Sequence, residues 1–99
     1  MLIHKYKKDI TVTSATGSDN TLKFSGGLLY QVFCKATTAT NIFDISLIDE
    51  DGDDIYSVDA IEGEHMDYGL TIPMRGIFTV RITSATVDEV IRVKLLIEE

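Results

Sequence analysis

Short segments with an apolar residue at every second position make up most of this 99-residue chain. In 42–49, for example, Phe43, Ile45 and Leu47 alternate with polar residues. Successive side chains of a strand point to opposite faces, so this pattern predicts strands that bury one face. We expect eight strands, over residues 2–12, 21–24, 28–38, 42–49, 55–58, 70–72, 77–83 and 87–97.

Turn-forming residues separate these segments at intervals of about eight to twelve residues, which is typical of β-sandwiches and barrels. The small polar stretch 14–20 and the irregular stretch 59–68 are expected as loops. Residues 49–54 should turn a hairpin with Gly52 at a positive φ, and Pro73 to Gly76 should form another turn. No helical pattern competes. The chain is therefore predicted to be one all-β domain, residues 1–99, folded as an antiparallel, jelly-roll-like β-sandwich.

The segment Leu28 to Thr38 differs because its first half is apolar on both faces. This indicates a central strand that is covered on both sides. Cys34 lies in it and is the only cysteine, so no internal disulfide can form, and we interpret it as a small buried apolar residue.

Charge is distributed very unevenly. Between Asp44 and Asp67 there are ten acidic residues and no Lys or Arg, and the whole chain has a net charge of −7. Nucleic-acid binding needs clustered bases, so this balance argues against it. No apolar run is long enough to span a bilayer, and the first residues lack the apolar core of a secretory signal. We therefore expect a chain made and kept in a cytoplasm, with no membrane partner.

Two acidic stretches are candidate metal sites. Asp49, Asp51, Asp53 and Asp54 could supply oxygen ligands to calcium from the 49–54 turn, although the spacing is not that of an EF-hand. The simpler interpretation is a solvated turn whose charges oppose edge-to-edge association. His65, between Glu62, Glu64 and Asp67, could bind zinc, but it lacks a second histidine and is more often an exposed side chain. No other cofactor is expected.

Catalysis has little support in the sequence. Ser25 precedes two glycines but lacks the glycine that comes before the serine in a nucleophile elbow. The chain has many carboxylates but no Trp, whereas glycosidase clefts usually combine acids with aromatic platforms. We therefore predict that this protein is not an enzyme.

Two basic features are candidate partner-binding residues. His4, Lys5, Lys7 and Lys8 form a basic patch in 1–9, which is either an N-terminal arm or an edge strand. Arg75 lies at the tip of the Pro73 turn. Either could contact an acidic surface, such as the 44–67 region of another copy.

Two segments, 43–56 and the Pro73-Met74-Arg75-Gly76 turn with its following strand, resemble the hairpin and strand of small jelly-roll sandwiches. Accessory domains of secreted peptidases and carbohydrate-binding modules share that pattern. The chain as a whole, with its small size, Thr/Ala-rich connections, acidic surface and basic start, resembles capsid decoration (cement) proteins of tailed bacteriophages. This resemblance implies a cofactor-free virion protein that forms homo-oligomers, with trimers favoured, on a major capsid or other virion protein.

The leading prediction is thus a non-enzymatic structural subunit of a larger assembly, in which strands and the segment Met1 to Asp9 contact neighbours. The alternative is a small carbohydrate- or calcium-binding β-sandwich module.

Overall fold

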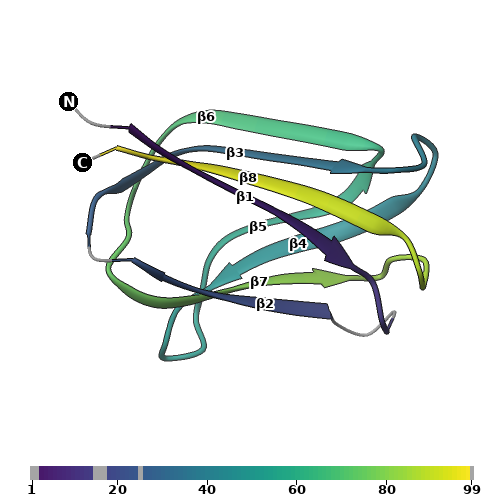
Figure 1. Cartoon of the computed structure of the whole chain (residues 1–99), viewed down its shortest axis with the longest axis horizontal. Coiled ribbons are helices and arrows are strands. Elements are labelled where there is room, and N and C mark those ends of the chain that lie inside the picture. Colours follow the sequence, from purple (N-terminus) through teal and green to yellow (C-terminus); the bar gives the residue numbers. More distant parts are fainter. Residues whose placement is uncertain (1–2, 15–17, 25, 99) are drawn as a thin grey trace.

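The computed structural model describes residues 3–14, 18–24 and 26–98, and it contains eight strands in two antiparallel sheets (Figure 1). We name the sheets by their strand order: sheet A is β1-β8-β3-β6 and sheet B is β2-β7-β4-β5. This is the order of a jelly roll, so the predicted fold class is confirmed. The strands are β1 (Ile3–Thr11), β2 (Ser18–Phe24), β3 (Leu28–Ala36), β4 (Ile42–Ile48), β5 (Asp54–Glu62), β6 (Glu64–Pro73), β7 (Gly76–Thr83) and β8 (Val90–Glu98).

The core lies between the two sheets and is built from the alternating apolar residues of the sequence. Ile91, Val93 and Leu95 of β8 face Phe43, Ile45 and other side chains of sheet B, and all of them are buried. Burial of apolar side chains contributes about 1.5–3 kcal/mol each, so these inner faces hold the sandwich together. Because each strand buries one face only, its other residues form the two broad outer surfaces of the molecule.

The stretch 59–68 is not a loop, and that prediction was wrong. β5 and β6 run through it and meet at Gly63, which has a φ of 77°. The Gly63 carbonyl accepts a bond from Ala36 at 2.7 Å, and its amide donates to Asn41 at 2.9 Å. A Cβ on Gly63 would lie 2.5 Å from the Ala39 carbonyl oxygen, so only glycine fits where the chain passes from one sheet to the other.

β3 is central in sheet A, but its outer side is not covered, contrary to prediction. Leu28 and Tyr30 are exposed, whereas Leu29 and Val32 are buried. The register between β3 and both of its neighbours shifts between Leu29 and Gln31. The extra residue, Tyr30, forms a bulge that returns the next apolar residue to the inner face. The apolar run therefore reflects a change of register rather than burial on two sides.

Other boundaries differ by a few residues. β2 begins at Ser18, inside the predicted 14–20 loop, and β8 begins at Val90, after the 84–89 turn. Ser84 and Asp88 have positive φ in that turn, a conformation that extended strands do not adopt. The strand therefore begins only at Val90. The 49–53 turn with Gly52 at φ 86° is confirmed, as is the turn that ends at Gly76.

Residues 1–9 were predicted to be either an N-terminal arm or an edge strand. The part that the structure describes, from Ile3 onward, is an edge strand. β1 pairs with β8 from Ile3–Glu98 to Thr11–Val90. Ile10 is buried, and the Tyr6 ring packs edge-on against Phe24 of β2 at 6.3 Å between centroids. Removal of residues 1–8 would therefore take most of a strand out of the sandwich.

Candidate interaction surface

The outer face of sheet A is formed by the outward-pointing residues of its four strands, which the register arranges in rows across the sheet. One row contains Asp9, Arg92, Lys35 and Glu64, and the next contains Lys7, Lys94, Phe33 and Met66. A third contains Lys5, Leu96, Gln31 and Tyr68. Five of the nine Lys and Arg residues thus lie on one face of an acidic protein.

Two lysines stand directly opposite each other in the second row. Lys7 of β1 pairs with Lys94 of β8, and within the described residues neither forms an ion pair with a carboxylate. Lys94 instead places its ammonium group 5.2 Å from the centroid of the Phe33 ring. Like charges opposite each other across a sheet are destabilising, so this row has an unfavourable interaction that an external anion would relieve.

Exposed apolar side chains gather on the same face. Tyr68 is 72% exposed and Met66 is 49% exposed, both on β6. Three more large apolar residues are exposed on this face of sheet A: Ile3, Leu28 and Tyr30. By contrast, the outer face of sheet B carries two such residues, Ile42 and Ile77. Contiguous exposed apolar side chains rimmed by charge are characteristic of protein-binding surfaces.

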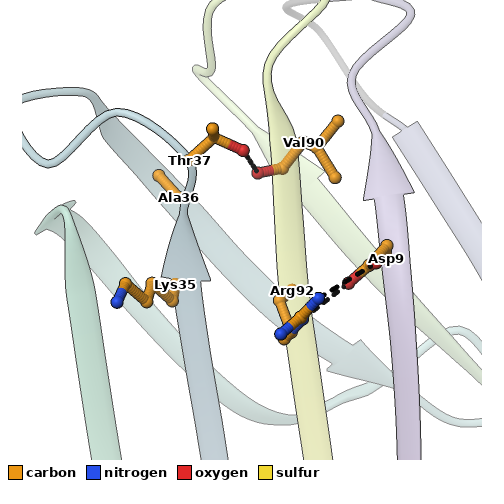
Figure 2. A pocket seen from close by; sticks show the side chains of 6 residues that line it. All are labelled: Asp9, Lys35, Ala36, Thr37, Val90 and Arg92. Atoms are coloured by element: carbon orange, nitrogen blue, oxygen red, sulfur yellow. Dashed lines mark hydrogen bonds and ion pairs between the residues drawn. The ribbon is translucent and has the colours of Figure 1, made fainter.

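A shallow hollow of about 400 Å³ lies at one end of this face, lined by Asp9, Lys35, Ala36, Thr37, Val90 and Arg92 (Figure 2). Arg92 donates two bonds to the Asp9 carboxylate, at 2.9 and 3.5 Å. These bonds hold the pKa of the Asp9 carboxyl below its usual value. In Figure 2, Lys35 extends from β3 away from this pair. Arg92 is thus neutralised by Asp9, whereas among the described residues Lys35 forms no ion pair, although it lies opposite Glu64 of β6 in the register.

The acidic 49–54 turn is stabilised by hydrogen bonds between one of its own carboxylates and its backbone. Asp49 Oδ1 accepts bonds from the amides of Asp51 and Asp53, at 3.0 and 2.9 Å. Glu50 accepts a bond from the Ile77 amide at 3.1 Å and so ties the turn to β7. Among the described residues, no three His, Cys, Asp or Glu side chains are grouped so that they could hold a metal ion. The structure thus does not bring Asp49, Asp51, Asp53 and Asp54 together as a calcium site.

Arg75 lies beside this turn of its own chain. The two line an open hollow of about 470 Å³ together with Ile55, Pro73 and Phe78. The predicted contact of Arg75 was with the acidic region of another copy, and it stays a prediction.

His65 meets a carboxylate and a phenol rather than a set of zinc ligands. Its Nε2 lies 3.0 Å from Asp67 Oδ2, and the same oxygen accepts a 2.6 Å bond from the Tyr56 hydroxyl. Bonds from Tyr56 and then His65 lower the pKa of Asp67, while burial, followed by the bond to Asp67, raises that of Tyr56. Tyr56 is on β5, an edge strand of sheet B, and Asp67 is on β6, an edge strand of sheet A. This contact therefore joins the two sheets along one side of the sandwich.

Cys34 is fully buried, as predicted, with its thiol directed toward the His65 carbonyl at 3.8 Å. Burial raises the pKa of the thiol to about 12, so it carries almost no thiolate at neutral pH. Cys34 therefore contributes to packing.

The predicted partner-binding residues divide between two sides of β1. Lys5 and Lys7 belong to the outer face of sheet A, whereas the exposed His4 and Lys8 point to the other side of the strand. Lys35, Arg92 and Lys94 were not predicted as partner-binding residues, because they lie beside Lys5 and Lys7 only through the order of β1, β8 and β3 in the sheet. Tyr56 was also missed, because its contact with Asp67 depends on the corner at Gly63.

No protein-family model and no curated protein sequence matches this chain. Solved structures do resemble it. A protein described as FLHE has a TM-score of 0.53 with 11% identity, and the match covers 98% of both chains. PliG of Aeromonas hydrophila, a periplasmic lysozyme inhibitor of g-type lysozyme, has a TM-score of 0.49 with 12% identity over 96% of this chain and 84% of its own. At such identities the likeness concerns the fold alone. Within the described residues, no helix is long and apolar enough to cross a membrane.

Proposed function

We propose that this chain is a non-enzymatic, protein-binding subunit that attaches to a larger assembly through the outer face of sheet A. The observation that carries the proposal is the row Lys7, Lys94, Phe33 and Met66, in which two facing lysines are followed by the half-buried Phe33 and the exposed Met66. A protein surface with an acidic group opposite the lysines and an apolar patch opposite Met66 would complement both features.

A protein partner fits this face better than a nucleic acid does. Asp9, Glu64 and Glu98 lie among the five bases, and the remainder of the chain is strongly acidic. A phosphate backbone favours an unbroken basic track, whereas a folded acidic protein can place its carboxylates away from these three residues.

The assembly that the sequence suggests is the virion of a tailed bacteriophage, where decoration proteins attach to a preformed shell. A compact, rigid sandwich with one adhesive face suits that role because it loses little conformational freedom on binding. Mass spectrometry of purified virions from the phage that encodes this chain tests the assignment. We expect the chain at a fixed ratio to the major capsid protein, and its absence would reject the virion.

Lysine footprinting tests the face. The chain in its isolated assembly and the purified chain are acetylated in parallel, and the modification of each lysine is compared. We expect protection of Lys7 and Lys94 and unchanged reactivity of Lys23, which is exposed on the outer side of sheet B. Protection of Lys23 alone would overturn the proposal, as would tighter binding of single-stranded oligonucleotides than of the assembly.

A further inference from the structure

We propose that β6 is an open sheet edge on which a second copy of this chain pairs, antiparallel and about a two-fold axis at Met66. The proposal concerns the edge of sheet A rather than its outer face, so it does not depend on the proposed function. The resemblance to decoration proteins implies trimers, whereas this edge is built for a pair.

The four sheet edges are not equally protected. β1 has Lys5, Lys7 and Lys8 along its length, and such charges discourage strand addition. β2 has seven residues, and β5 is acidic and kinked where its register with β4 shifts at Phe43–Ile45. β6 is the longest strand, with ten residues, and it runs one-for-one with β3 from Glu64 to Tyr68. Its register with β3 shifts beyond Tyr68, but the stretch from Glu64 to Tyr68 is regular and has no lysine, so it is an edge segment available for pairing.

The backbone of β6 presents a usable row of hydrogen-bonding groups. The bond from the Ala36 amide to the Gly63 carbonyl makes Gly63 point toward β3, and the regular register continues from there. Alternate residues of a strand direct their N–H and C=O groups to opposite sides. His65 and Asp67 therefore bond to β3, whereas the groups of Glu64, Met66 and Tyr68 point to the open edge.

The same segment is complementary to itself. An antiparallel pair centred on Met66 brings Met66 opposite Met66 of the second copy and Glu64 opposite its Tyr68, and these are the residues with outward-pointing backbone groups. The residues between them place His65 opposite Asp67 of the second copy. Among the described residues, the two groups that bond to Asp67 both use Oδ2, which leaves Oδ1 for the histidine that arrives from the second copy.

Charge opposes this pairing at long range. Each copy carries a net charge of −7, and β5, with Asp54, Asp59 and Glu62, lies on the same side of the sandwich as β6. The backbone bonds and the Met66 contact are short-ranged, whereas this repulsion is screened beyond about 8 Å at physiological ionic strength. Added salt should therefore strengthen the pair, although it weakens binding between a basic face and an acidic partner.

The pair would have a continuous eight-stranded sheet, with the two outer faces of sheet A side by side. An assembly that offers repeated sites would then be bound by two faces at once, which raises the overall affinity without any new contact.

Sedimentation of the full chain over a range of concentrations at about 50 and 500 mM salt tests the association itself. We expect a reversible dimer whose dissociation constant falls as salt rises. Met66→Lys should raise that constant at least about 10-fold, because two lysines would meet on the axis. The matched control is Ile3→Lys, because Ile3 is 53% exposed on the opposite edge of the same sheet; it should change the constant by less than about 2-fold.

Mild oxidation of Met66→Cys tests the register. Paired residues of this type have Cα atoms about 5.5 Å apart, which permits a disulfide, and the buried Cys34 thiol should not compete. Ile77→Cys, at a 43% exposed site on sheet B, should remain uncrosslinked. A monomer at all concentrations, or a dimer in which Ile77→Cys crosslinks and Met66→Cys does not, would overturn the pairing. Neither result would affect the lysine footprint of the proposed function.

Discussion

The two outer faces of the sandwich are built alike but treat their charges differently. On sheet B, Arg81 donates two bonds to the Asp19 carboxylate, at 2.8 and 2.9 Å, and the same row continues into Ser46 and Ser57. On sheet A, Arg92 has a similar partner in Asp9, but Lys7 and Lys94 face each other without one. On each sheet one arginine thus has a carboxylate partner, but among the described strand pairs only sheet A sets two lysines directly opposite each other.

This difference shows why an overall charge is a poor guide to a binding surface. In the stretch with ten carboxylates, Asp49 accepts bonds from the backbone of its own turn and Glu50 accepts a bond from β7. The two facing like charges are instead on sheet A, whose strands carry five of the six lysines. A surface is prepared for a partner where local interactions are left incomplete, and two facing lysines beside an exposed Met66 meet that description.

The largest effect that this comparison predicts is on binding. The double variant Lys7→Glu with Lys94→Glu should weaken attachment to the assembly at least about 100-fold, or about 2.8 kcal/mol, because it reverses both charges that face the acidic partner. Titration by surface plasmon resonance against the immobilised assembly measures this. Lys23→Glu reverses a charge on sheet B, and an equal loss in that variant would contradict the distinction between the faces.

The contact between the sheets gives the next largest effect. Tyr56→Phe removes the 2.6 Å bond to Asp67 and should lower the free energy of unfolding by about 1 kcal/mol. This value is near the low end for a hydrogen bond to a charged group, because the Asp67 side chain is partly exposed to solvent. The melting temperature should fall by about 4–8 °C, as measured by thermal unfolding. Tyr30→Phe is the control, since Tyr30 is exposed on the outer face of sheet A.

The same variant has a predicted pH dependence. The pKa of Asp67 is lower in the folded chain than its ordinary value of 3.8. Its contribution is therefore fully present above that ordinary value and is lost as pH falls through the lower, folded pKa. The difference in the free energy of unfolding between Tyr56→Phe and the parent chain should become smaller as pH falls through that acidic range. A difference that stays constant down to full protonation would mean that the bond does not act through the Asp67 charge.

A smaller effect of opposite sign should separate the two faces directly. Lys7→Glu replaces a repulsive pair with an attractive one and should raise the free energy of unfolding by about 0.2–1 kcal/mol, or the melting temperature by about 1–8 °C. Arg81→Glu on sheet B replaces an attractive pair with a repulsive one and should lower it. Denaturation in urea at low salt would reveal both signs. Destabilisation by Lys7→Glu would show that sheet A has no unrelieved repulsion.

The smallest expected effect concerns the acidic turn. Because Asp49 Oδ1 is already bonded to two amides, addition of millimolar calcium should change the melting temperature by less than about 1 °C relative to chelator. Melting curves with each addition measure this. A rise of several degrees would favour the calcium-binding module and would make the turn, rather than the outer face of sheet A, the main functional surface.

Strand existence was predictable wherever one face of a strand is buried, as for Phe43, Ile45 and Leu47 of β4. It was not predictable for the junction of β5 and β6, because edge strands carry polar residues on both sides and a one-residue corner at Gly63 has no established sequence pattern. The bulge at Tyr30 was hidden for a related reason, since a change of register makes an alternating strand look apolar throughout.

The candidate surface depends on contacts that no local pattern contains. Lys7 and Lys94 are far apart in the sequence, and they become neighbours only through the register of β1 with β8. The sequence indicated a basic patch near the start of the chain. The bases that complete this patch, Arg92 and Lys94, lie near the opposite end of the sequence. The Tyr56–Asp67 bond likewise requires the two sheets to be stacked before the two groups meet.

The pairing of β1 with β8 also constrains the order in which the protein can fold. Among the described strands, only β4 and β5 are consecutive in the chain and adjacent in a sheet, whereas β1 must wait for β8. Contacts between distant parts of a chain cost more entropy to form, so folding should begin at the acidic β4–β5 hairpin and proceed outward. During synthesis β1 leaves the ribosome before the other seven strands and must wait for the last of them to pair, so its lysines oppose association of that strand with other chains in the meantime.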